Sequence, residues 1–118
     1  MSRDFRVYLE DIVEAAGRIG EYTKGLSQDD FSQDRKTVDA VVRNLEVIGE
    51  AAKKVPDDVR QLASHIDWRK IAGLRDILIH QYFGIDLEII WNIVTTKVAD
   101  LDFEIRNLLD TLNTQDSN

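Results

Sequence analysis

The sequence predicts one all-α domain, an antiparallel bundle of four to five helices, from three observations. Apolar residues recur every three or four positions along most of the chain, the period of an amphipathic helix and not of a strand. The chain has 118 residues but a single proline, Pro56. Its 43% hydrophobic and 31% charged residues are typical of a folded soluble domain, which we expect to span residues 1–118.

Two long helices are predicted in the first half of the chain. The first ends near Gly25, because glycine readily adopts the backbone conformation that stops a helix. Residues 27–30 are expected to form a polar loop. The second helix closes before Pro56. The apolar stripes are Phe5, Leu9, Ile12, Ala16 and Ile19 in the first helix, and Val38, Val41, Val42, Leu45, Ile48, Ala52 and Val55 in the second.

Two more main helices are predicted in the second half, after a short connecting helix at residues 57–63. Asp67 has the side chain of an N-cap, and the third main helix should run from it up to Gly84. Asp86 caps the last and longest helix, and the tail should fray from about residue 113. Glycine costs up to about 1 kcal/mol inside a helix, so we expect close helix–helix approach where it occurs. The positions are Gly17, Gly20, Gly49 and Gly73.

Composition excludes several classes of protein. Without cysteine, the chain has no disulfides, thiolate zinc sites or cysteine nucleophile. No segment approaches the ~18 apolar residues of a membrane span, and the start of the chain lacks a signal-peptide pattern, so we expect a cytoplasmic location and no membrane partner. A net charge of −7 argues against binding to duplex DNA.

The acidic charge is unevenly distributed. Residues 35–75 hold nine Lys and Arg against six Asp and Glu, a balance of +3. Residues 76–118 hold two against eight, a balance of −6. The basic segment could meet a phosphate-bearing ligand, although helix faces that are simply solvated explain the same imbalance.

The residues best suited to chemistry are Arg75, His80 and Tyr82, near the end of the third predicted helix. Histidine exchanges protons near neutral pH, and the arginine fork suits a phosphate. Together they could cleave RNA, whose 2′-hydroxyl is a built-in nucleophile. On an ideal helix, however, Arg75 and His80 are about 140° apart. They can meet at one phosphate if the helix ends irregularly, or if a two-fold axis joins two chains. Tyr82 lies two turns (~10 Å) from Arg75 on the same face.

These three residues match the R-x4-H-x-Y motif of the HEPN superfamily, in particular the HepT-like toxins of HepT/MntA toxin–antitoxin systems. Residues 43–51 resemble the second-helix signature of that family, and residues 68–76 and 83–91 resemble the segments that flank its motif. The similarity extends over most of residues 5–112, and no motif position departs from the family pattern.

The resemblance implies a HEPN-type helical bundle that dimerises and builds a metal-independent ribonuclease site from both protomers, without a cofactor. Arg75 and His80 would be the catalytic pair, with RNA as the substrate. Tyr82 would accept AMP from ATP through an MntA-like nucleotidyltransferase antitoxin, and the added phosphate would compete for Arg75. Asp76 precedes His80 by four residues and could orient its imidazole ring.

Two alternatives remain at this stage. The chain could be a non-catalytic helical module that binds and regulates a nucleotidyltransferase, which its negative charge favours because RNA-binding enzymes are more often basic. It could also be a helical dimer whose motif only stabilises the interface.

Other residues have simpler interpretations. His65 is expected in a loop or cap, and Trp68 and Trp91 in the core. Glu46 and Glu50 are expected to be solvated or paired with Arg43 or Lys54. No spacing typical of a metal site occurs.

Overall fold

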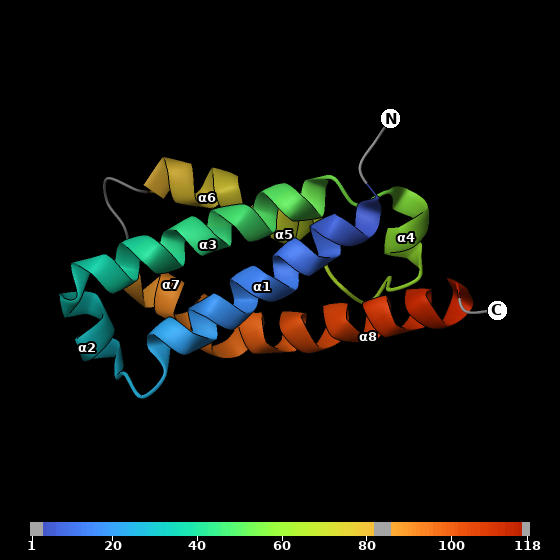
Figure 1. Cartoon of the computed structure of the whole chain (residues 1–118). Helices are drawn as coiled ribbons and strands as arrows, with labels where there is room; N and C mark the ends of the chain where they lie inside the picture. The colour runs from blue at the N-terminus through green and yellow to red at the C-terminus, as the bar shows by residue number, and fades with distance from the viewer. Residues whose placement is uncertain (1–3, 82–85, 117–118) are drawn as a thin grey trace.

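The structure, a computed structural model, describes residues 4–81 and 86–116; for residues 79–81 and 115–116 it describes the backbone only. Every regular element in these residues is helical, which confirms the all-α class. Long helices form the frame (Figure 1): α1 (Phe5–Thr23) packs against both α3 (Arg35–Lys53) and α8 (Ala99–Asp116). None of the described helices is long and apolar enough to cross a bilayer.

The polar loop predicted at residues 27–30 is wrong, because the chain forms a short helix there, α2 (Gln28–Gln33). The Asp30 N–H donates to the Ser27 hydroxyl, and the Ser27 N–H donates to the Asp30 carboxylate, both at 3.1 Å. This reciprocal capping box satisfies two N–H groups at the start of the helix. The side chain of Phe31 is fully buried and anchors α2 to the core. The same polar residues that suggested a loop therefore initiate a helix.

α3 buries the apolar stripe expected from the sequence and ends before Pro56 as predicted. Its N-cap is Asp34, whose carboxylate accepts hydrogen bonds from the Thr37 hydroxyl at 2.7 Å and the Thr37 N–H at 3.2 Å. These hydrogen bonds lower the pKa of Asp34 because they stabilise the ionised carboxylate. The connecting helix expected next is α4 (Asp57–Gln61).

The third predicted helix is broken. The chain that we expected to be continuous from Asp67 up to Gly84 divides at Gly73 into α5 (Trp68–Ala72) and α6 (Leu74–Gln81). Asp67 caps α5 as expected, whereas Gly84 lies outside the described residues. Glycine weakens a helix at this point, and the break allows both short segments to pack against α3.

The last predicted helix begins at its expected cap, Asp86, but it is not a uniform α-helix. It consists of α7 (Leu87–Ile93), one π-helical turn η2 (Val94–Val98) and then α8. Two threonine hydroxyls in η2 donate to backbone carbonyls four residues earlier, at 2.8 and 2.6 Å. They compete with helical N–H groups for these acceptors, which favours a wider turn. α8 continues through Asp116, beyond residue 113 where we expect the tail to begin.

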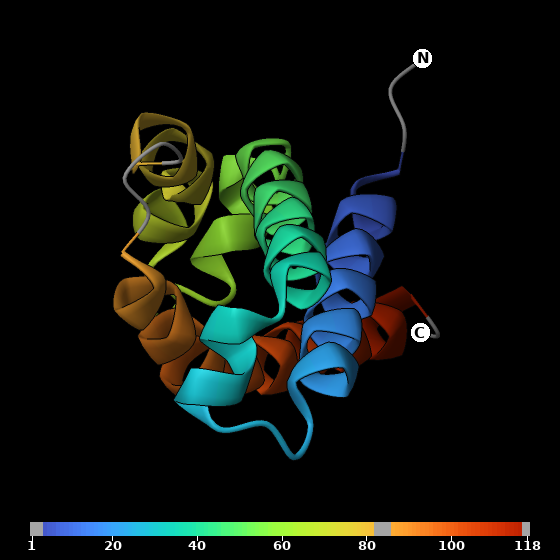
Figure 2. The ribbon, with the colours of Figure 1, turned by 90° about the vertical axis from the view of Figure 1, so that its left-hand side faces the viewer.

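Among the described residues, Gly49 is the one helical glycine that brings a neighbouring helix close. A Cβ added at Gly17 or Gly20 would have nothing within 4 Å, so the expected close approach is wrong at these positions. Gly25 has a φ of 77° and stops α1 as predicted. Seen along the long helices, α1, α3, α6 and α7 stand around the core (Figure 2). Gly49 therefore influences where α6 lies relative to α3.

Candidate active site

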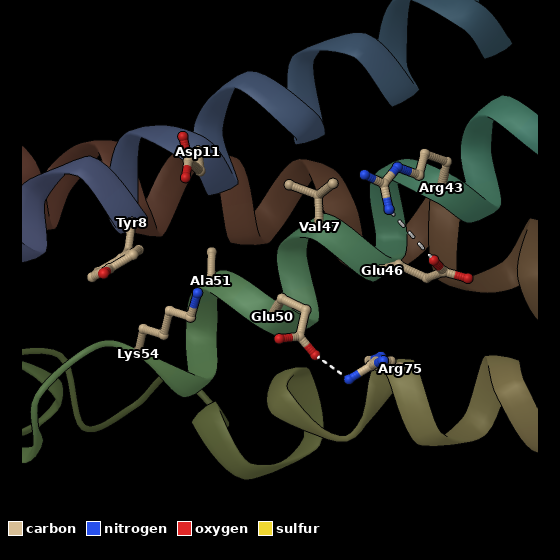
Figure 3. A pocket seen from close by; sticks show the side chains of 9 residues that line it. All are labelled: Tyr8, Asp11, Arg43, Glu46, Val47, Glu50, Ala51, Lys54 and Arg75. Carbon is tan, nitrogen blue, oxygen red and sulfur yellow. Dashed lines mark hydrogen bonds and ion pairs between the residues drawn. The ribbon is translucent and has the colours of Figure 1, made fainter. Parts of the chain in front are cut away.

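Arg75 lies beside a pocket of about 290 Å³ between α1, α3 and α6 (Figure 3). It is the second residue of α6, and 47% of its side chain is exposed, so a ligand can reach the guanidinium. The lining residues are Tyr8 and Asp11 from α1, Arg43, Glu46, Val47, Glu50 and Ala51 from α3, Lys54 at its C-cap, and Arg75. One residue of the predicted catalytic pair is thus placed on a pocket.

The pocket contains three cations and three carboxylates. Its cations are Arg43, Lys54 and Arg75, and its carboxylates are Asp11, Glu46 and Glu50. All three cations come from the basic segment at residues 35–75, as expected for a local phosphate site. The formal charge of the pocket is nevertheless balanced, because α1 contributes Asp11 and α3 turns two of its own carboxylates toward the same space.

Glu50 pairs with Arg75 across two helices. Its Oε1 accepts a hydrogen bond from Arg75 Nη1 at 2.8 Å, and Lys53 Nζ lies 3.9 Å from the same oxygen. The partner expected on its own helix, Lys54, instead places its ammonium 5.6 Å from the centre of the Tyr8 ring. The expected partners of Glu50 are therefore wrong. The Glu50–Arg75 pair is half-exposed and contributes about 0–1 kcal/mol to stability, so it matters more for the placement of Arg75.

For Glu46 the prediction is confirmed. One of its carboxylate oxygens lies 3.8 Å from Arg43 Nη1, three residues earlier on α3. Glu46 and Glu50 thus line the same pocket one turn apart but pair with different arginines.

Gly49 sets the distance between α3 and α6 beside this pair. A Cβ at Gly49 would lie 3.3 Å from the backbone nitrogen of Arg75 and 3.3 Å from the carbonyl oxygen of Ile71. A side chain at this position would press the backbones of α3 and α6 apart by a few tenths of an ångström, so glycine favours their present spacing. Sequence reasoning did not connect Gly49 or Glu50 with Arg75. The available signal was their place in residues 43–51, one of the segments that resemble the family.

The other two motif residues are less fully described. His80 belongs to α6, and only its backbone is described, while Tyr82 lies outside the described residues. Asp76 is exposed on α6, and its pairing with His80 remains a prediction.

The remaining candidate residues make contacts within the fold. His65, in the turn before α5, pairs through Nε2 with the Glu104 carboxylate of α8. Trp68 is buried, as predicted, and its indole N–H donates to a backbone carbonyl at 3.2 Å. Trp91 is partly buried, with its ring centre 5.2 Å from that of Phe31. Among the side chains that the structure describes, residues 4–78 and 86–114, no three from His, Asp or Glu gather as they would around a metal ion.

Comparison with known families agrees with the resemblance carried by the motif. Residues 12–108 match the model of the family described as Ribonuclease HepT-like. The chain belongs to the HepT-like ribonuclease family. A "Probable ribonuclease HepT" of Thermococcus cleftensis is 44% identical over 108 residues, which cover 92% of this chain and 98% of that protein.

Methanocaldococcus jannaschii also has proteins similar to this chain. A "Putative RNase" is 43% identical over 116 residues, covering 98% of this chain and 96% of that protein. A "Gamma-glutamylcyclotransferase and putative RNase" is 40% identical over all 118 residues, and the chain spans about half of it, 53%. No solved structure matches the chain significantly.

The HepT-like match contains most of the pocket. It covers the contributions of α3 and α6, including Glu50 and Arg75, whereas Tyr8 and Asp11 precede its first residue. The contact between Glu50 and Arg75 therefore lies within the part of the chain that defines the family.

Proposed function

We propose that this HepT-like chain is the toxin of a toxin–antitoxin system and a metal-independent endoribonuclease, with Arg75 and His80 as its catalytic residues. The active site is composite and lies at the interface of a homodimer. An MntA-like nucleotidyltransferase antitoxin neutralises the enzyme by transferring AMP to Tyr82. The whole chain, residues 1–118, acts as one HEPN-type domain.

The observation that carries this proposal is the regular course of α6 through both catalytic residues. Because α6 is α-helical from Leu74 to Gln81, Arg75 and His80 leave its axis about 140° apart. Of the two solutions left open by the sequence, an irregular helix end is thus disfavoured. A two-fold axis would instead bring Arg75 of one protomer toward His80 of its partner.

An apolar surface beside the motif supports dimerisation. Ile77 of α6 is 44% exposed and Ile89 of α7 is 42% exposed, and both border a small apolar depression between these helices. Side chains of this kind gain free energy when a second copy covers them, about 25 cal/mol per Å² of apolar area.

The chemistry needs only side chains and the RNA itself. A neutral His80 removes the proton of a ribose 2′-hydroxyl, and the oxygen attacks the adjacent phosphorus. The bond from phosphorus to the 5′-oxygen breaks, and the imidazolium formed on His80 returns its proton to that oxygen. The products are a 2′,3′-cyclic phosphate and a 5′-hydroxyl. Arg75 stabilises the negative charge that develops on the phosphorane.

AMP transfer to Tyr82 would hinder the binding of RNA to Arg75. The Tyr82 hydroxyl attacks the α-phosphorus of ATP, releasing pyrophosphate and a proton, and forms a phosphodiester. The modification adds a negative phosphate and a bulky adenosine to a residue seven positions after Arg75 in the sequence. RNA would then meet both repulsion and steric exclusion.

Mixed dimers test the composite site. Arg75→Ala and His80→Ala should each abolish RNA cleavage in EDTA, with fold and dimer unchanged by circular dichroism and light scattering. Co-refolding the two variants should recover up to about a quarter of wild-type activity, because one dimer in two is mixed and carries one intact site. Full activity of either variant alone would reject its catalytic role. A wild-type protein that cleaves no RNA would favour the regulatory module instead.

A further inference from the structure

Two adjacent residues of α3, Gly49 and Glu50, contact Arg75 of α6. The backbone of Arg75 lies against Gly49, and its guanidinium reaches the next residue of α3, Glu50. α3 thus determines the position of both the backbone and the guanidinium of Arg75.

We propose that Gly49 and Glu50 are positioning residues for Arg75: Gly49 sets the place of its backbone, and Glu50 orients its guanidinium. This inference rests on the proposed function, in which Arg75 binds the reacting phosphate. Neither residue touches the substrate.

Glu50 can orient Arg75 without occupying its phosphate-binding donors. The hydrogen bond between them uses one nitrogen, Nη1, and one carboxylate oxygen, Oε1. A guanidinium has five N–H donors in one rigid plane, so fixing one corner orients the others while leaving them available. Arg75 remains 47% exposed in this arrangement.

The charge of Glu50 is also shared. Lys53 Nζ lies 3.9 Å from the same oxygen, so two cations surround one carboxylate and this cluster keeps a formal charge of +1. An approaching phosphate therefore meets net positive charge at Arg75, even though the pocket as a whole is balanced. With Lys53 as a second partner, Glu50 holds Arg75 in place without cancelling its positive charge.

Gly49 contributes through the backbone. Both atoms 3.3 Å from its missing Cβ belong to the main chain of α5 and α6, so neither can rotate away from an added methyl group. Alanine at this position requires α6 to move by a few tenths of an ångström. Such a shift carries Arg75 away from the phosphate, and misplacement by 1 Å can cost about 100-fold in rate.

Two substitutions at Glu50 separate orientation from charge. Glu50→Gln keeps an acceptor oxygen for Nη1 and should hold kcat within about two-fold while lowering KM, since a negative charge is removed. Glu50→Ala removes the acceptor and should lower kcat about ten-fold. The matched control is Glu14→Ala, which removes the carboxylate of another exposed ion pair, the one with Arg18 on α1 outside the pocket, and kcat should stay within about two-fold. Equal kcat for both Glu50 variants, whether unchanged, raised or reduced, overturns the assignment.

A second measurement does not depend on catalysis. In ¹⁵N relaxation of the full-length protein, the Arg75 Nε should be ordered in wild type and Glu50→Gln, and mobile in Glu50→Ala. Gly49→Ala should move the Arg75 backbone amide resonance and lower kcat about ten-fold, whereas Gly17→Ala should do neither. If Arg75 loses its order in Glu50→Ala but the wild-type protein has no RNase activity, the proposed function is rejected and the positioning role stands. Unchanged Arg75 order in Glu50→Ala rejects the positioning role.

Discussion

Replacing single glycines by alanine gives a quantitative test of helix packing in this protein. Gly17 and Gly49 both lie inside long helices, so alanine should gain about 1 kcal/mol of helix propensity at either position. The two sites differ in what the new methyl group meets. At Gly17 there is nothing within 4 Å, whereas at Gly49 two backbone atoms lie at 3.3 Å.

The expected free energies of unfolding follow from this difference. Gly17→Ala should keep its full gain of about 1 kcal/mol, which corresponds to a rise in Tm of about 4 °C for a domain of this size. At Gly49 the steric cost of overpacking, about 1–3 kcal/mol, exceeds the gain in propensity. We expect Gly49→Ala to lose about 1 kcal/mol and about 4 °C in Tm.

The assay is thermal and urea unfolding followed by circular dichroism, at one protein concentration because the proposed dimerisation would make Tm concentration-dependent. The double variant should return close to the wild-type Tm, since the two sites lie on different helices and their effects should add. A rise in Tm for Gly49→Ala equal to that for Gly17→Ala would refute the reasoning. It would mean that α3 and α6 do not require a glycine between them.

Three further predictions concern the buried ring of Phe31, the N-cap Asp34 and the proposed AMP acceptor Tyr82. Phe31→Ala should lower the free energy of unfolding by about 3–5 kcal/mol in urea, because a fully buried ring that packs against Trp91 is lost. The lowered pKa of Asp34 stabilises the fold above the ordinary Asp pKa of about 3.9, and this contribution disappears as the pH falls through the lower folded-state value. Asp34→Asn should therefore show a weaker loss of stability below about pH 4 when unfolding is measured against pH. Tyr82→Phe should still cleave RNA but gain no AMP mass when incubated with the transferase and ATP.

Each of these has a matched control or a contrary result. Phe103→Ala, on a ring that is 63% exposed, should change stability by less than about 0.5 kcal/mol. If the Asp34→Asn variant loses stability in acid as steeply as wild type, other carboxylates determine the loss of stability at low pH. Tyr22→Phe, at an exposed tyrosine of α1, should gain AMP as wild type does. AMP mass on Tyr82→Phe would place the acceptor elsewhere.

Much of the helical architecture was predictable because its causes are local. The apolar stripes of α1 and α3, the stop at Gly25 and the caps Asp67 and Asp86 depend on residues within one or two turns. α2 was missed because Ser27 and Asp30 have side chains suited to both a loop and a helix start. The burial of Phe31, which depends on distant helices, selects the helix.

The break at Gly73 and the π-helical turn η2 had no decisive local signal. In each case a continuous apolar stripe predicts one helix, since a stripe does not show where packing against neighbours changes its direction or register. The apolar stripes therefore predict the residues of α5–α6 and of α7–η2–α8 but not the points at which the α-helices are interrupted.

By itself, the sequence determined the helical class, because periodicity is a property of the chain alone, and its resemblance to a known family pointed to Arg75, His80 and Tyr82 as the motif. Tertiary structure decided the surroundings of Arg75. Glu50 is 25 residues away in the sequence, and its sequence neighbours Arg43 and Lys54 were more obvious partners. Only the packing of α6 on α3 at Gly49 brings that carboxylate within 2.8 Å of the guanidinium, because contacts between helices depend on side-chain volume on both surfaces.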